Sequence, residues 1–144
     1  MIPLRFLLLA GLGLALGPLP AHSQPVPSAE ELVERTLAYH DPGGAWAAGR
    51  HRFTLREERP GGRDRATVVT LEPGTGGFAF RSEREGRIIE AQLDDDGCTA
   101  TIDGEADFSA ELRDRYRLSC EGLAWLRAYY GFLLGLPMKL RDPG

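Results

Sequence analysis

The sequence predicts an α+β fold, in which a curved antiparallel β-sheet follows one helix and carries further helices on its concave face. Three observations lead to this prediction. Residues 51–102 alternate apolar and polar side chains, which is the period of strands covered on one face only. The turns between these strands are too short for crossover helices, so neighbouring strands should be antiparallel. Residues 28–39 and 109–136 instead space their apolar side chains as helices do.

Residues 1–23 have the pattern of a secretory signal peptide. Arg5 precedes an apolar run of 11 residues, which a Gly-Pro-Leu-Pro segment ends. The small residues Ala21 and Ser23 fit the site of signal peptidase, so we expect cleavage after Ser23. A membrane anchor is the alternative, but spanning a bilayer takes about 20 apolar residues. No cysteine lies near the cleavage site for lipid attachment, and residues 24–144 are enough for a single domain.

The charge of the exported chain argues against polyanionic partners. Removing the signal peptide takes away one arginine and no acid, which lowers the net charge from −4 to −5. A negative domain has no overall electrostatic attraction for nucleic acid or for anionic lipid headgroups. We therefore expect no nucleic-acid partner. We also expect no membrane span in the mature protein, because its longest apolar segment is too short.

The chain contains two cysteines, Cys98 and Cys120. An isolated pair in an exported protein usually forms a disulfide, which would stabilise the fold by about 3 kcal/mol. A metal site and a reactive thiol are the alternatives. No second Cys/His pair stands at metal-binding spacing, and no nearby group would lower a thiol pKa. We therefore predict a structural Cys98–Cys120 disulfide.

The first helix should begin at a capping box formed by Ser28 and Glu31 and should run to about Tyr39. Five strands should follow it, within residues 52–56, 66–71, 78–81, 89–94 and 98–102. Asp96-Gly97 is a strong hairpin signal between the last two strands. The short connections predict a meander, in which each strand pairs with the next one along the chain.

Two helices should follow the sheet. Ser109 can cap a short charged helix over residues 110–115. Residues 121–136 are apolar nearly all round, which is typical of a helix that is buried on most sides. At 16 residues, this segment is short for a membrane span.

The sequence contains weak signals for metal binding and for catalysis. Residues 94–97 could be read as a calcium loop, but carboxylates do not alternate there as an EF-hand requires, so a solvated hairpin tip is favoured. His40 and Asp41 could act as a base and its orienting carboxylate, but no nucleophile motif accompanies them. A histidine packed on the apolar stripe of the first helix is the favoured interpretation of His40.

Aromatic side chains gather in the last helix. Trp125, Tyr129 and Phe132 share one helical face, and Tyr130 belongs to the other face. They could line a lipid or peptide pocket, or they could fill the core against the sheet. The sequence leaves both interpretations open.

Several segments carry a family resemblance: AYHDP at 38–42 with Trp46, YRLSC at 116–120, YYG at 129–131, and GLPMKLRDPG at 135–144. With these segments the chain resembles a family of exported bacterial proteins of unknown function. That family is related in fold to periplasmic lipoprotein carriers and outer-membrane lipoprotein-sorting proteins. The resemblance implies a half-open barrel, a periplasmic location and further strands after Gly144. It supplies no catalytic residues.

The expected function is non-enzymatic binding of an apolar ligand, such as a lipid or a lipoprotein acyl chain, in the periplasm. No cofactor or metal is expected. The alternative is a structural or protein-interaction module without a small-molecule ligand, and a hydrolase using His40 is a third possibility. The candidate ligand-binding residues are Tyr39, His40, Trp125, Tyr129, Tyr130 and Phe132.

Overall fold

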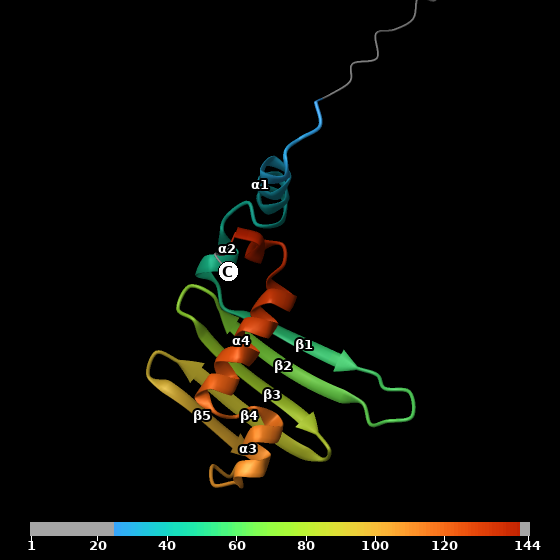
Figure 1. The fold of residues 1–144 in the computed structure, drawn as a ribbon, viewed down its shortest axis with the longest axis vertical. Helices are drawn as coiled ribbons and strands as arrows, with labels where there is room; N and C mark the ends of the chain where they lie inside the picture. Colours follow the sequence, from blue (N-terminus) through green and yellow to red (C-terminus); the bar gives the residue numbers. More distant parts are fainter. Residues whose placement is uncertain (1–24, 142–144) are drawn as a thin grey trace, which may run out of the picture.

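The computed structural model describes residues 25–141 and consists of an antiparallel sheet crossed on one face by a long helix (Figure 1). The predicted signal peptide with its cleavage site lies outside the described residues, as do residues 142–144. The fold is α+β, as the sequence predicts. Among the described residues, no helix is both long and apolar enough to cross a membrane.

The sheet contains five strands in the order in which they occur along the chain. Each strand pairs with the next in antiparallel fashion, so the predicted meander is confirmed. The sheet is open, with the first and last of these strands at its edges. The strands are β1 (His51–Glu57), β2 (Arg65–Glu72), β3 (Gly77–Arg84), β4 (Arg87–Asp94) and β5 (Gly97–Ile102).

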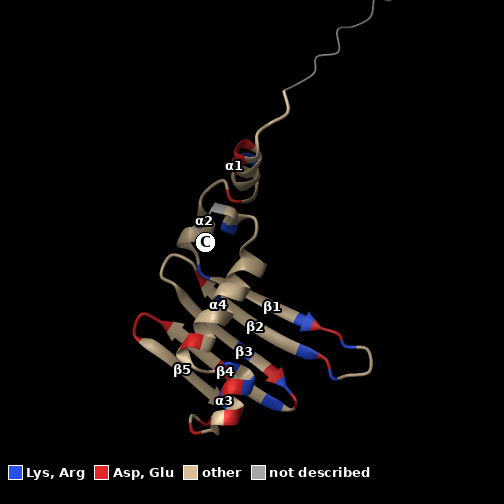
Figure 2. Ribbon diagram, viewed as in Figure 1, with Lys and Arg blue, Asp and Glu red and all other residues tan. Residues whose placement is uncertain are grey.

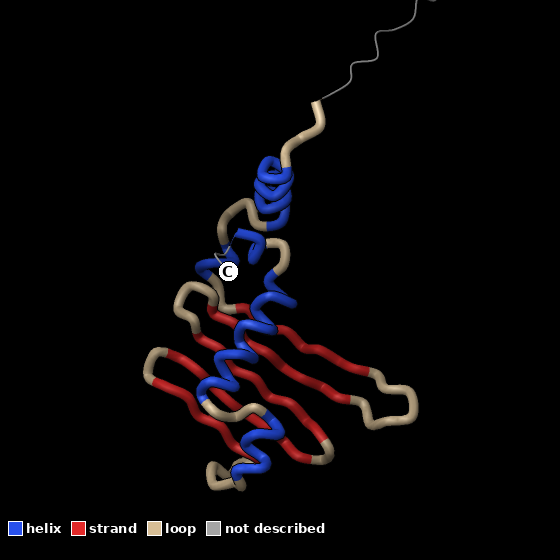
Figure 3. The backbone as a smooth tube through the Cα atoms, in the orientation of Figure 1, coloured by secondary structure: helices blue, strands red, loops and turns tan. Residues whose placement is uncertain are grey.

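The two faces of the sheet differ because side chains alternate along each strand. Val69, Phe80 and Ile89 point to one face and are almost inaccessible to solvent. Within this apolar face, the hydroxyls of Thr67 and Ser82 satisfy each other with a 2.8 Å hydrogen bond. No helix within residues 25–141 lies over the other face (Figure 3). Coverage of one side only is therefore confirmed.

The covering layer consists of α3 (Ala110–Tyr116) and α4 (Cys120–Gly135), which lie on the same face of the sheet (Figure 3). Ser119 caps α4 by accepting a 3.0 Å hydrogen bond from the Gly122 backbone. The inner side of α4 is buried through Leu123, Leu126 and Tyr130. The prediction that α4 is buried on most sides is wrong, because its outer side carries large apolar side chains that face solvent.

The N-terminal helix, α1 (Ala29–His40), stands beyond the end of the sheet and buries no residue (Figure 1). Its predicted cap is present, since the Glu31 backbone donates a 3.1 Å hydrogen bond to Ser28. His40 is exposed and makes an edge-on contact with Tyr39, with 5.1 Å between ring centroids. The interpretation of His40 as a packed histidine is therefore wrong, because nothing covers the helix at that point.

Two short helices complete the fold: one joins α1 to β1, and the other follows α4 and contacts α1. The first is α2 (Ala45–Ala48), and the second is the 3₁₀ helix η1 (Met138–Arg141). The carboxylate of Asp41 fixes the start of α2, because it accepts hydrogen bonds of 2.7 and 3.0 Å from the backbones of Ala45 and Trp46.

The cysteines form the predicted disulfide. Cys98 at the start of β5 is bonded to Cys120 at the start of α4, with 5.4 Å between their Cα atoms. The bridge joins an edge strand directly to the helix that covers the sheet.

Candidate functional site

A cleft of about 370 Å³ with a largely apolar wall lies between α4, α2, η1 and the turn that joins β2 to β3. We call it the apolar cleft. Its size lies at the lower end of the range for small-molecule sites. The side chains that define it are Trp46, Leu71, Pro73, Arg127 and Lys139, with Gly131 opening its helical wall.

Trp46 forms one wall of the apolar cleft, and several contacts fix its position. Its indole stacks on His51 with 4.5 Å between ring centroids, and His51 Nε2 donates a 2.9 Å hydrogen bond to the Trp46 carbonyl. The ring also packs against α4 where Gly135 leaves room: a Cβ atom there would lie 2.6 Å from Trp46 Cζ2. Two rigid aromatic groups and a glycine thus set the shape of this wall.

Gly131 lies one turn before Gly135 on the same side of α4. Gly135 is crowded by its neighbours, whereas Gly131 has open space beside it. A Cβ atom added at Gly131 would meet no atom within 4 Å. Because Gly131 lines the apolar cleft, the open space beside it belongs to the cleft. A glycine in the middle of a helix lowers stability relative to alanine by about 0.5–1 kcal/mol. The space at Gly131 is therefore maintained at a cost to the helix.

The apolar cleft is lined by charged side chains as well as by apolar ones. Arg127 donates a 2.9 Å hydrogen bond to the Gly76 carbonyl, which ties the β2–β3 turn to α4. Lys139 reaches the cleft from η1, and Glu72 lines it while pairing with Arg50 at 3.1 Å. Arg127 places a fixed positive charge in the lining, which suits an apolar molecule with an acidic head.

A second apolar surface runs along the outer side of α4. We call it the outer row: Trp125, Tyr129, Phe132 and Leu133. These side chains are between 48% and 60% exposed. Trp125 and Tyr129 stack in parallel with 5.5 Å between centroids, and the Arg117 guanidinium lies 4.3 Å from the Trp125 ring centroid. Figure 2 shows that α4 is almost uncharged between its ends.

The six residues predicted to bind ligand do not form one site. Trp125, Tyr129 and Phe132 lie together on the outer row, whereas Tyr39 and His40 lie on α1, which stands off the sheet (Figure 1). The Tyr39 ring is 82% exposed. Tyr130 belongs to the core, where it packs against Phe78 with 6.3 Å between ring centroids.

The apolar cleft itself was not predicted from the sequence. Trp46, Arg127 and Lys139 come from three separate elements, and only the fold brings them together. The one local signal was the pair of glycines inside an apolar helix, Gly131 and Gly135, since interior glycines often mark a close approach or an open space.

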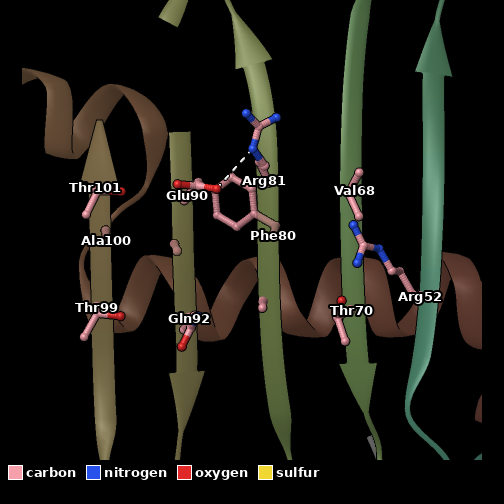
Figure 4. Close-up of a pocket in the computed structure, with 12 residues that line it drawn as sticks. Arg52, Val68, Thr70, Phe80, Arg81, Glu90, Gln92, Thr99, Ala100 and Thr101 are labelled. Atoms are coloured by element: carbon pink, nitrogen blue, oxygen red, sulfur yellow. Dashed lines mark hydrogen bonds and ion pairs between the residues drawn. The ribbon is translucent and has the colours of Figure 1, made fainter. Parts of the chain in front are cut away.

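The uncovered face of the sheet holds a shallow groove of about 430 Å³. Thr70, Gln92 and Thr99 project from it on the side away from α4, which lies behind the strands in Figure 4. An ion pair between Arg81 and Glu90, 3.1 Å long, crosses the groove (Figure 4). The surface is shallow and polar, and among the described residues Arg52 is the one charge in its lining besides the Arg81–Glu90 pair, so we assign it no chemistry.

The described residues contain no cluster of three or more histidine, cysteine or acidic side chains that could hold a metal ion. The segment 94–97 forms the hairpin tip favoured from the sequence, in which the Asp96 backbone donates a 3.0 Å hydrogen bond to the Asp94 carboxylate. His51 is engaged in the wall of the apolar cleft. Comparison of the chain with protein-family models, with curated proteins and with solved structures yields no match.

Proposed function

We propose that the protein is an exported, non-enzymatic binding protein for an amphipathic molecule with an acyl chain, and that the apolar cleft is its binding site. The observation that carries this proposal is an open apolar cleft with Arg127 and Lys139 among its lining residues. We further propose a periplasmic location and a relation to the lipoprotein carriers. The open antiparallel sheet with helices on one face is compatible with that relation.

The apolar wall supports binding of a hydrocarbon chain. Each methylene group removed from water contributes about 0.8 kcal/mol, so roughly ten of them against Trp46 and Leu71 would supply the roughly 8 kcal/mol of micromolar binding, before the cost of association is subtracted. The space beside Gly131 admits the chain without movement of α4. The core between α4 and the sheet is filled, since Leu123 is 0% exposed, so a ligand between helix and sheet would have to displace packed side chains.

The charge of Arg127 supports an acidic head on the same ligand. Arg127 is held in place by the Gly76 carbonyl, and a guanidinium so fixed can still donate its other N–H groups to a carboxylate. Non-covalent binding of this kind needs no catalytic group. The residues 1–23 and the disulfide are both typical of export to an oxidising compartment.

The test uses palmitate as probe and Trp46 as reporter. The sequence contains two tryptophans, so Trp125→Phe leaves Trp46 as the single source of tryptophan fluorescence. We expect palmitate to shift the Trp46 emission of delipidated Trp125→Phe protein. Adding Gly131→Leu should fill the cleft and weaken palmitate binding by about tenfold or more, whereas the matched control Gly131→Ala should change it little.

Two results would contradict the proposal. One is the absence of palmitate binding by calorimetry in the delipidated protein. The other is binding that survives Gly131→Leu and disappears when Trp125 is replaced by serine, which would move the ligand to the outer row.

A protein-interaction function is the second candidate, and the outer row favours it. Stacked Trp125 and Tyr129 beside Arg117 have the residue types that dominate the energy of protein interfaces. This function is favoured over the first if palmitate is ignored while Trp125→Ser changes the sedimentation of the protein at high concentration.

A further inference from the structure

Arginines line up across the covered face of the sheet at the end opposite the apolar cleft. The strand register pairs Glu57 with Arg65 and pairs Arg84 with Arg87. It also pairs Ala66 with Glu83, so the next position in the same register sets Arg65 beside Arg84. These side chains share the face of Thr67, Ser82 and Ile89, because each lies two residues along its strand from one of them. We call Arg65, Arg84 and Arg87 the arginine row.

Arg84, in the middle of the arginine row, is the member without a counter-ion. Arg65 donates from Nε to Glu57 at 2.8 Å, and Arg87 pairs with Asp103 at 3.3 Å. Arg84 donates a 3.1 Å hydrogen bond to the hydroxyl of Ser82, and within residues 25–141 no carboxylate lies at ion-pair distance from it.

The surroundings of Arg84 disfavour an unpaired cation. The side chain is half-buried. Burial lowers the pKa of the Arg84 guanidinium, and the neighbouring charge of Arg65 lowers that pKa further. Like charges directly opposite each other on neighbouring strands destabilise a sheet. A bound anion would offset both costs.

Arg84 lies in a cleft of about 600 Å³, which we call the arginine cleft. Its walls are the β1–β2 hairpin, the β3–β4 turn and α3. Five arginines line it against three acids: Arg59, Arg63, Arg65, Arg84 and Arg115 against Asp64, Glu83 and Glu85. Figure 2 shows charged residues concentrated at this end of the sheet.

Some of these charges neutralise one another, and others do not. Arg115 pairs with Glu85 at 2.7 Å, and the Tyr116 hydroxyl donates to the same carboxylate at 3.1 Å. Arg63 reaches from the β1–β2 hairpin toward the β3–β4 turn, where its Nη1 would lie 3.6 Å from a Cβ at Gly86. Like Arg84, Arg63 makes no ion pair with any residue in the range 25–141.

We propose that the arginine cleft binds a phosphate group, with Arg84 at its centre and Arg65 and Arg63 beside it. Guanidinium groups are the side chains that best match phosphate oxygens, which they contact through two parallel N–H groups. Arg63 and Arg65 come from the β1–β2 turn and the start of β2, and Arg84 comes from the end of β3, so they can approach a tetrahedral anion from more than one direction. The net charge of −4 disfavours a long polyanion, so the ligand is a small phosphate ester or a single lipid headgroup.

The test measures binding of inorganic phosphate by calorimetry in a buffer without other multivalent anions. We expect binding at one site, and we expect Arg84→Gln to weaken it by about tenfold or more. The matched control is Arg81→Gln in the same strand, on the uncovered face and paired with Glu90. It should change phosphate affinity by less than about twofold. If Arg84→Gln fails to fold, Arg84→Lys keeps the charge but loses the two-pronged contact and should still weaken binding.

A parallel measurement with phosphatidylcholine vesicles, with and without phosphatidate, identifies the source of the phosphate. Arg84-dependent binding of phosphatidate vesicles alone assigns the site to a lipid headgroup, and Arg84-dependent binding of inorganic phosphate alone assigns it to a soluble ester. Either result supports the proposal. It is overturned if neither probe binds, or if Arg84→Gln and Arg81→Gln behave alike. Because Gly131→Leu should leave phosphate binding unchanged, failure of this site and failure of the acyl site are distinguishable.

Discussion

The two ends of the covered sheet face are built from the same strands, but one end carries apolar side chains and the other carries charged ones. Where β2 ends and β3 begins, Leu71 and Phe78 point toward α4, and the apolar cleft opens beside them. Where β2 begins and β3 ends, Arg65 and Arg84 occupy the equivalent face. The path of α4 accounts for the difference, because the helix crosses the sheet obliquely (Figure 1). Side chains under α4 are apolar and fixed by shape, whereas those beyond it are charged.

The largest expected effect concerns the packed region between the two ends. Leu123→Ala should lower the free energy of unfolding by about 2–5 kcal/mol, because it leaves a cavity between α4 and the sheet. Leu133→Ala on the outer row is the matched control, and its cost should stay below about 1 kcal/mol since Leu133 is 48% exposed. Urea unfolding followed by circular dichroism measures both. Equal losses would show that the outer row is covered in solution.

The disulfide should come next in size. Replacing Cys98 and Cys120 together by serine should cost about 3 kcal/mol, chiefly because the unfolded chain regains the freedom that the crosslink removes. Guanidinium unfolding of the oxidised protein and the double variant gives the difference. A loss below about 1 kcal/mol would mean that packing of Leu123 and Leu126 alone holds α4 on the sheet.

The sequence predicted the sheet because local rules decide it. Alternation around Phe78 and Phe80 predicts a strand, and Asp96-Gly97 predicts a hairpin between the last two strands. Both are confirmed, although the turn itself is formed by Asp95 and Asp96, because Gly97 pairs with Asp94. The exposure of the outer row could not be predicted, since a helix that is apolar all round has no polar side to reveal which side packs. The proximity of Arg65 and Arg84 depends on register, which no local pattern shows.

The positions of Trp46 and His40 could not be predicted from the sequence for a different reason. The four residues of α2 are too few to show a helical period, so nothing marked Trp46 as a wall of a cleft. The prediction for His40 failed because an amphipathic stripe does not guarantee a partner. The stripe on α1 is present and is partly covered at Val33 and Leu37, but His40 at its end is exposed.

The apolar end can be tested through its two glycines. Gly135→Ala should destabilise the protein by about 1–3 kcal/mol, because the new methyl group would overlap Trp46 and the Lys139 side chain. Gly131→Ala meets open space and should stabilise it by about 0.5–1 kcal/mol through the higher helix propensity of alanine. Thermal unfolding of the two variants measures the contrast. If both stabilise, Trp46 does not pack against α4.

The charged end should show the smallest effect, and its response to pH should separate it from the apolar end. Hydrogen bonds from Arg65 hold the pKa of Glu57 below its ordinary value of 4.5. A lowered carboxyl pKa contributes stability that is present above pH 4.5 and is lost as pH falls through the folded-state pKa.

Glu57→Gln should therefore lower stability at pH 7 by less than about 1 kcal/mol, because the Glu57 side chain is 38% exposed and solvent screens the pair. As pH falls below 4.5, the difference from the unmodified protein should shrink, and it should vanish once the carboxylate is protonated in both the folded and the unfolded state. The cost of Gly135→Ala, which involves no titrating group, should stay constant over the same range. Thermal unfolding at several pH values measures both. A Glu57→Gln difference that does not change with pH would show that the arginine row, like the apolar cleft, is held by shape.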